Sequence, residues 1–145
     1  MKEGKGLVNF YDYDGKLIFE GEYLNGKRNG KGKEYGKLRF EGQYLDNGRW
    51  KGNFFDENGN IIYELDKEKN IVKEYDDDGK LIFEAGYLKG KKNGKGKEYN
   101  YNGKLLFEGE YLNGLRNGKG KEYNYNGNLE FEGEYLYSKR WEGKG

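Results

Sequence analysis

Aromatic and acidic residues alternate along short segments of the chain. In Leu105–Leu112, Phe107 and Tyr111 share one side of an extended strand, and Glu108 and Glu110 share the other. An alternation of apolar and polar residues with a period of two is typical of a β-strand that buries one face. The segment is therefore predicted to be a strand with an aromatic face and an acidic face.

A basic segment follows each acidic one and is predicted to pair with it. Lys119–Tyr125 is the second predicted strand after Leu105–Leu112. The six residues Asn113–Gly118 between them are rich in Asn and Gly, which tolerate the positive φ angles of turns. Each pair is predicted to be a β-hairpin, joined to the next one by an Asp-Gly or Asn-Gly turn. These joining turns are Asp14-Gly15, Asn58-Gly59, Asp78-Gly79, Asn102-Gly103 and Asn126-Gly127.

Opposite charges on neighbouring strands support the hairpin prediction. If the loop of six residues closes symmetrically, Glu110 faces Lys121 and Tyr111 faces Gly120. A facing pair of opposite charges contributes roughly 0.2–1 kcal/mol, and an aromatic ring over a glycine also stabilises a sheet. The balance of acidic and basic residues is therefore built into each hairpin.

The hairpin is repeated along the chain. Phe83, Phe107 and Phe131 mark equivalent positions 24 residues apart. Units start at residues 17, 38, 61, 81 and 105, with a half-unit at 4–15 and a last partial unit at 129–145. The copy at Ile61–Asp78 is degenerate, because it lacks glycines that the other copies share. The pattern predicts one repeat domain over residues 1–145, an all-β, elongated, single-layer antiparallel meander of stacked β-hairpins.

The composition agrees with a β structure that has an aromatic core. Gly accounts for 26 of the 145 residues, and a Gly inside a helix costs roughly 1 kcal/mol. The 15 Tyr, 8 Phe and 2 Trp residues can bury large areas where aliphatic residues are few. The 27 basic and 26 acidic residues give a net charge of +1, which favours neither disorder nor binding to nucleic acid.

Several residue types used in catalysis are missing from the sequence. It has no Cys and no His, and Ser138 is its only Ser, which excludes the usual pairs of nucleophile and base. We therefore expect no enzymatic activity and no cofactor. No apolar run reaches 18 residues, and no apolar segment follows the first residues as in a signal peptide. A cytoplasmic location is expected, with association to a membrane or to the cytoskeleton left open.

Two acidic patterns have simple explanations. Asp76–Gly79 resembles part of a calcium loop, but Ala85 stands where the loop needs a Glu ligand, so no metal site is predicted. Glu108 and Glu110 stand about 7 Å apart on one strand face, within the range of glycosidase carboxylates. Such pairs recur opposite Lys in nearly every unit, and charge pairing explains them better.

The repeated residues also match a known motif. Phe107–Tyr111, Asn113-Gly114 and Gly118–Gly120 read Phe-Glu-Gly-Glu-Tyr, Asn-Gly and Gly-Lys-Gly, and Phe19–Gly32 and Phe83–Gly96 are similar. This sequence resembles the MORN (membrane occupation and recognition nexus) repeat over essentially the whole chain. The resemblance implies a non-enzymatic scaffold that binds a protein partner, often a helical segment in a long groove. Other proteins of this kind self-associate or are linked to phosphoinositide membranes.

A row of aromatic side chains on the first strands is the main candidate for a partner site. One interpretation is that the rings only pack on neighbouring hairpins. The other is that they line a groove for a helix or an extended segment of a protein partner, as large exposed apolar surfaces often do. The row consists of Phe19, Tyr23, Phe40, Tyr44, Phe83, Tyr87, Phe107, Tyr111, Phe131 and Tyr135.

Basic residues in the hairpin loops suggest an alternative function. They are either solvated turn residues or a row of positive charge that binds an anionic, phosphoinositide-containing membrane. The residues are Lys27, Arg28, Lys91, Lys92 and Arg116.

The two end strands suggest self-association. Gly4–Tyr13 is a second strand without its first strand, and Leu129–Tyr137 is a first strand followed by a shortened mate. Unpaired strand edges favour association with another chain, so a homo-oligomer formed through the ends is also expected.

Overall fold

The computed structural model describes residues 4–141 and contains no helix within them. The last four residues of the predicted partial unit 129–145 lie outside the described residues. The chain divides into two compact units, Met1–Glu68 and Lys69–Gly145. The boundary falls inside the degenerate copy at Ile61–Asp78, and the single repeat domain stays a prediction.

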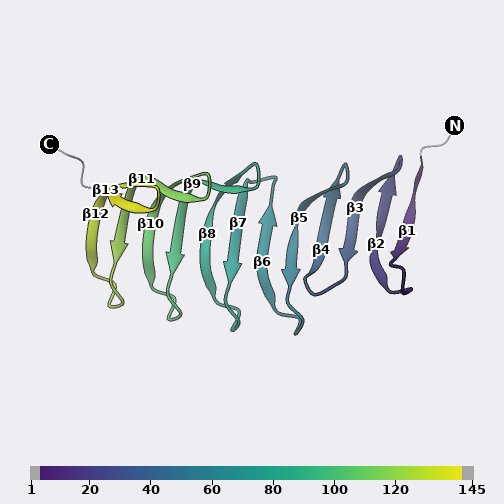
Figure 1. Ribbon diagram of the computed structural model, residues 1–145, viewed down its shortest axis with the longest axis horizontal. Helices are drawn as coiled ribbons and strands as arrows, with labels where there is room; N and C mark the ends of the chain where they lie inside the picture. Colours follow the sequence, from purple (N-terminus) through teal and green to yellow (C-terminus); the bar gives the residue numbers. More distant parts are fainter. Residues whose placement is uncertain (1–3, 142–145) are drawn as a thin grey trace. The chain divides into compact units, whose positions relative to one another are not determined.

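Each unit is one layer of antiparallel strands that pair in chain order (Figure 1). The first unit contains β1 (Lys5–Tyr11), β2 (Leu17–Leu24), β3 (Lys27–Glu34), β4 (Arg39–Leu45), β5 (Gly48–Phe55) and β6 (Ile61–Asp66). The second contains β7 (Ile71–Tyr75), β8 (Leu81–Leu88), β9 (Lys91–Tyr99), β10 (Leu105–Leu112), β11 (Leu115–Tyr123), β12 (Leu129–Leu136) and β13 (Lys139–Trp141). The predicted all-β meander of hairpins is confirmed.

Outside the degenerate copy, where residues 67–70 join β6 to β7, the turns within the hairpins contain two residues rather than the predicted six. Asn113 and Gly114 have φ angles of 52° and 88°, and Leu112 pairs directly with Leu115. Two consecutive residues with positive φ form a tight turn whose twist matches that of the flanking strands. The same kind of turn occurs at Asn25-Gly26, Asp46-Asn47, Lys89-Gly90 and Tyr137-Ser138.

The short turn changes the register of the two strands. Glu108, rather than the predicted Glu110, lies opposite Lys121. The prediction was wrong because residues 115–118, assigned to the loop, belong to β11. A bulge in this part of the hairpin, where Gly118 has a φ of 95°, accommodates the extra residues.

The five predicted joining turns are confirmed, and an Asp or Asn side chain caps each of them, whereas residues 35–38 join β3 to β4 without an Asp or Asn. The Oδ1 atom of Asp76 accepts the backbone N–H groups of Asp78 and Lys80, both at 2.9 Å. Equivalent caps occur at Asp12, Asp56, Asn100 and Asn124. Asp76 therefore serves the turn. Within residues 4–141, no cluster of three or more acidic side chains is arranged to hold a metal ion.

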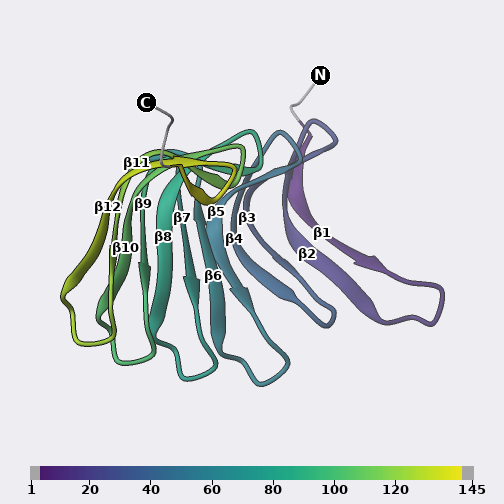
Figure 2. The same cartoon turned by 60° about the vertical axis from the view of Figure 1, so that its left-hand side comes forward.

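Aromatic rings form the core on one face of each unit. The rings of Phe107 and Tyr111 are neighbours with centroids 5.8 Å apart, and the Phe107 ring lies over Gly109. Residues four positions apart on a straight strand are about 13 Å apart. The rings can meet because Gly109 carries no side chain between them and because the hairpins are bent along their length (Figure 2).

Rings also cover glycines of the neighbouring strands, but the ring that covers each glycine differs from the predicted one. The sequence placed Tyr111 over Gly120. In the structure, a Cβ atom added at Gly120 would lie 2.7 Å from Cε1 of Phe107, and one added at Gly96 would lie 2.7 Å from Cε2 of Tyr111. Tyr111 therefore packs on the preceding hairpin, as the changed register requires.

Candidate functional site

Most of the aromatic residues predicted to contact a partner are buried. Those with at most 6% of their surface exposed are Phe19, Phe40, Tyr44, Phe83, Phe107, Tyr111 and Tyr135. Their rings contact one another across hairpins, as between Phe107 and Tyr135, whose centroids are 5.2 Å apart. These rings form the core and offer no open groove. The row can touch a partner only through its half-buried members, Tyr23, Tyr87 and Phe131, and partner binding by the row stays a prediction.

In several hairpins, a glutamate at the end of the second strand accepts hydrogen bonds from side chains of the next hairpin. Glu98 accepts hydrogen bonds from Arg116, Nε at 3.0 Å and Nη2 at 2.8 Å, and from the hydroxyl of Tyr111. Burial alone would raise the pKa of the Glu98 carboxyl, but the bonds from Arg116 and Tyr111 outweigh it and hold that pKa below its usual value. Burial and the bond to Glu98 raise the pKa of Tyr111. The same arrangement joins Glu34 to Tyr44 and Arg49, and Glu122 to Tyr135 and Arg140.

These contacts were not predicted from the sequence, although their spacing repeats. The Tyr and the Arg follow the Glu by 13 and 18 residues both at Glu98 and at Glu122. Charged and polar residues that recur at fixed offsets from one another are a detectable signal of contact between adjacent repeats.

Three of the five basic residues predicted to bind a membrane lie against the aromatic face. The Arg116 guanidinium is 4.0 Å from the ring centroid of Phe107. Arg28 lies 4.0 Å from the Phe19 ring, and the Nζ atom of Lys92 lies 3.6 Å from the Phe83 ring. These cations are strand residues because the turns are short. Lys27 and Lys91 are exposed, and membrane binding stays a prediction that depends mainly on them.

The opposite face of the second unit carries a groove. A Cβ atom added at Gly109 would point toward the ring of Phe107, at 2.7 Å from Cζ. Because successive residues of a strand point to opposite faces, Glu108 and Glu110 point away from the rings. On their side lies a groove of about 790 Å³ that extends across β8 to β12, with Ile71 of β7 at one end. Its floor is the backbone at Ala85, Gly96, Gly109, Gly120 and Gly133.

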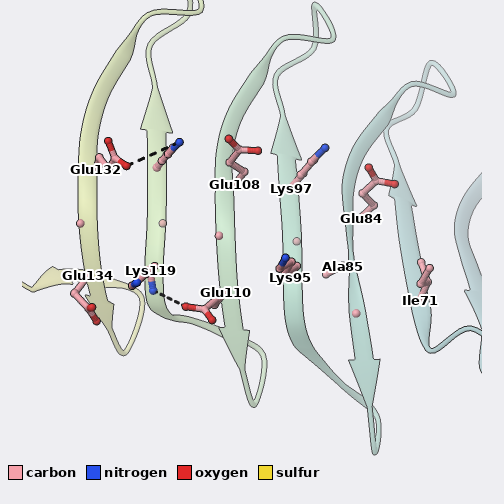
Figure 3. Close-up of a pocket in the computed structure, with 16 residues that line it drawn as sticks. Ile71, Glu84, Ala85, Lys95, Lys97, Glu108, Glu110, Lys119, Glu132 and Glu134 are labelled. Carbon is pink, nitrogen blue, oxygen red and sulfur yellow. Dashed lines mark hydrogen bonds and ion pairs between the residues drawn. The ribbon is translucent and has the colours of Figure 1, made fainter.

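Two rows of charged side chains form the walls of this groove (Figure 3). One row, with one residue from each strand in order, is Glu84, Lys97, Glu108, Lys121 and Glu132. The other row, from β9 to β12, is Lys95, Glu110, Lys119 and Glu134. The sign of the charge alternates from strand to strand, and both rows carry the same sign on the same strand. The walls therefore present a regular pattern of charge.

Contacts within the walls orient the acidic side chains without closing the groove. The hydroxyl of Tyr123 donates to Glu108 at 2.9 Å, and Glu110 accepts the backbone N–H of Lys119 at 2.8 Å. Lys121 and Glu132 are 3.9 Å apart, and their side chains are 45% and 61% exposed. Exposed ion pairs of this kind contribute little, about 0.2–1 kcal/mol. These charges can therefore exchange partners when a ligand arrives.

The first unit repeats this construction. A groove of about 780 Å³ extends over β1 to β4, and its charged walls include Glu20, Glu22, Lys31, Lys33 and Glu41. The groove thus follows from the repeated sequence and not from one local irregularity.

Family models place the chain among known repeat proteins. The MORN repeat model matches residues 19–37 and 107–129, and the model of a MORN repeat variant matches residues 5–25, 70–89 and 92–113. Together these matches cover more than half of the 145 residues. The chain is a MORN repeat protein. MORN repeats are generally non-catalytic modules that interact with proteins or membranes.

No curated protein matches this MORN repeat protein. Among solved structures, it is similar to the crystal structure of TarM, with 16% sequence identity and a TM-score of 0.26. The match covers 79% of this chain and 21% of that chain, so the MORN repeat protein spans about a fifth of the TarM structure.

Two further sequence expectations stay predictions for this MORN repeat protein. The part of the chain that the structure describes has no helix long and apolar enough to cross a membrane, and a cytoplasmic location stays a prediction. At the ends, β1 pairs with β2 and β13 pairs with β12. Self-association through these end strands also stays a prediction.

Proposed function

We propose that this MORN repeat protein is a non-enzymatic interaction module that binds a protein partner along the charged groove of its second unit. The proposal keeps the protein partner that the sequence suggests but moves the contact to the face opposite the aromatic row. The observation that supports it is the groove across β8 to β12, together with the burial of the rings on the other face.

The dimensions and chemistry of the groove suit a segment of a chain better than a small molecule. Five strands spaced about 4.8 Å apart extend over about 19 Å. Each exposed charge pair contributes about 0.2–1 kcal/mol, so useful affinity needs several pairs along the groove. A protein segment that crosses the strands can make many of these contacts at once.

Photo-crosslinking from defined positions tests the proposal. The photoreactive residue p-benzoylphenylalanine is placed in the full chain at Lys97, in the wall of the groove, or at Lys104, an exposed turn residue outside the groove. Each variant is irradiated in an extract of the cells that produce the protein, and crosslinked proteins are identified by mass spectrometry.

We expect one protein to be captured from Lys97 and not from Lys104. The crosslinked peptide of that protein is then mapped, and it should be the same when the crosslinker is moved to Lys121, in the same wall of the groove but on β11. Equal capture from Lys104, or capture only from the half-buried aromatic position Tyr87, would refute the assignment of the groove as the partner site.

A further inference from the structure

We infer that the groove of the second unit binds an extended protein segment in the polyproline II conformation, in which a pair of oppositely charged neighbouring residues recurs every three residues. The inference rests on the proposed function and specifies the backbone and the charge pattern of the partner. Its basis is the match between two regular spacings, one in the groove walls and one in the ligand.

The spacing of like charges in the walls is close to one turn of polyproline II. Acidic residues of one row lie on alternate strands, as Glu84, Glu108 and Glu132 do on β8, β10 and β12. Strands are about 4.8 Å apart, so these charges repeat every ~9.6 Å along the groove. Polyproline II has three residues per turn and a rise of about 3.1 Å per residue, which gives ~9.3 Å per turn. In each turn of a polyproline II ligand, one side chain can therefore lie opposite an acidic strand.

The second wall determines which charge is favoured at the following residue of the ligand. Both rows carry the same sign on the same strand, as Glu108 and Glu110 do on β10 and Lys119 and Lys121 do on β11. A ligand residue opposite Glu108 is followed by one about 3.1 Å further along and turned by about 120° toward the other wall. Along the groove, that residue is ~1.7 Å from the neighbouring basic strand and ~3.1 Å from the acidic strand of Glu108. It therefore lies nearer to the basic strand. A basic residue is therefore best followed by an acidic one, and the third residue of the turn faces solvent.

Other backbone conformations fit the groove less well. In a β-strand, side chains on one side repeat every ~6.7 Å, which falls out of phase with walls that repeat every ~9.6 Å. An α-helix is about 10–12 Å wide with its side chains. Residues i and i+2 of a strand, such as Glu108 and Glu110, stand about 7 Å apart, so a helix would sit above the walls and not between them.

A synthetic peptide tests the inference directly. The probe is fluorescein-labelled (Lys-Glu-Pro) repeated six times, because Pro at every third position favours polyproline II. Fluorescence anisotropy measures its binding to the full chain at low salt. The matched control is (Lys-Lys-Pro) repeated three times followed by (Glu-Glu-Pro) repeated three times, which has the same composition and net charge but lacks the alternating pairs.

We expect the alternating peptide to bind at least about fivefold more tightly than the block peptide, and its affinity to fall as salt is added. Equal affinity for the two peptides, or no binding of the alternating one, overturns the inference. So does tighter binding of a helical peptide in which Glu and Lys alternate at successive turns.

Groove variants localise the binding. Lys97→Glu should weaken binding of the alternating peptide by about three- to tenfold, and Lys97→Gln by less, because an attraction is reversed in one case and only removed in the other. Lys104→Glu makes the same change of net charge outside the groove and should leave the affinity unchanged. Equal effects of Lys97→Glu and Lys104→Glu would show that the peptide responds to net charge alone and would overturn the inference.

Failure of the inference can be told apart from failure of the proposed function. If the natural partner crosslinks at Lys97 but its crosslinked segment lacks charge pairs at three-residue intervals, the proposed function stands and the polyproline II inference is wrong. If no partner crosslinks at the groove, both fail.

Discussion

Adding one methyl group at Gly120 should destabilise the second unit of the protein. A Cβ atom at this position would lie 2.7 Å from Cε1 of Phe107 and 2.9 Å from Cε2 of Tyr135. Gly120→Ala therefore requires at least one of the two rings to move. The Phe107 ring has little room to do so. It is 0% exposed, and the guanidinium of Arg116 lies 4.0 Å from its centroid.

The size of the effect follows from the cost of overpacking a closely packed core. Inserting a methylene-sized group where neighbours cannot retreat typically costs about 1–3 kcal/mol. A loss of about 2 kcal/mol reduces the folding equilibrium constant roughly 30-fold. With a urea dependence of about 2 kcal/mol per molar, the unfolding midpoint should fall by about 1 M. Urea titrations followed by far-UV circular dichroism measure this shift.

Two variants show whether the rings cause the effect. Gly6→Ala is the matched control, because a Cβ atom there meets nothing within 4 Å, and its stability should stay within about 0.5 kcal/mol of the natural protein. Phe107→Leu shortens the ring side chain, so combining it with Gly120→Ala should cost less than the sum of the two single changes. A Gly120→Ala protein as stable as the natural one, or strictly additive costs in the double variant, would refute the packing of rings on glycines.

Four further expectations concern stability and exchange. The folded-state pKa of Glu98 is depressed, so its contribution is present above the unfolded value of about 4.3 and is lost as pH falls through the folded value. Glu98→Gln should therefore flatten the acid limb of a plot of stability against pH. Tyr111→Phe removes the hydroxyl that donates to Glu98 and should cost about 1–2 kcal/mol in urea titrations. Asp76→Ala removes a cap that accepts two N–H groups and should cost about 1 kcal/mol by thermal melting. Amide hydrogens of β6 and β7 should exchange faster than those of β10 and β11, because the degenerate copy lacks the shared glycines and each repeat is stabilised only by its neighbours; equal protection would contradict this expectation.

The strands and the turns that join the hairpins could be predicted from the sequence, because both have local signals. The alternation of Phe107 and Tyr111 with Glu108 and Glu110 fixes which residues share a face. The register within a hairpin could not be derived from the sequence, because Asn113–Gly118 contains an Asn-Gly pair at each end, and either pair could form the turn. The structure shows that the first two of these residues make the turn.

The sequence pattern did not predict which face of the sheet is open. Strand alternation separates an aromatic face from a charged face but does not say which one is closed. Closure of the aromatic face depends on rings meeting over residues without side chains, such as Gly109, and on cations such as Arg116 covering the rings. Both are contacts between hairpins, and they depend on the register. From the sequence, the charged residues of the groove could be recognised as pairs of opposite charge on neighbouring strands, but not as the walls of a groove.

The central claim is that the charged face, and not the aromatic face, receives the partner. Side-chain NMR signals separate the two faces, because Lys97 and Lys121 lie in the groove wall and Tyr87 is a half-buried member of the aromatic row. We would record the lysine methylene and tyrosine ring signals of the full chain while adding the partner identified by crosslinking. We predict that the signals of Lys97 and Lys121 shift or broaden with saturation while the ring signals of Tyr87 stay in place. Shifts of the Tyr87 ring with unchanged signals from both lysines would contradict this claim.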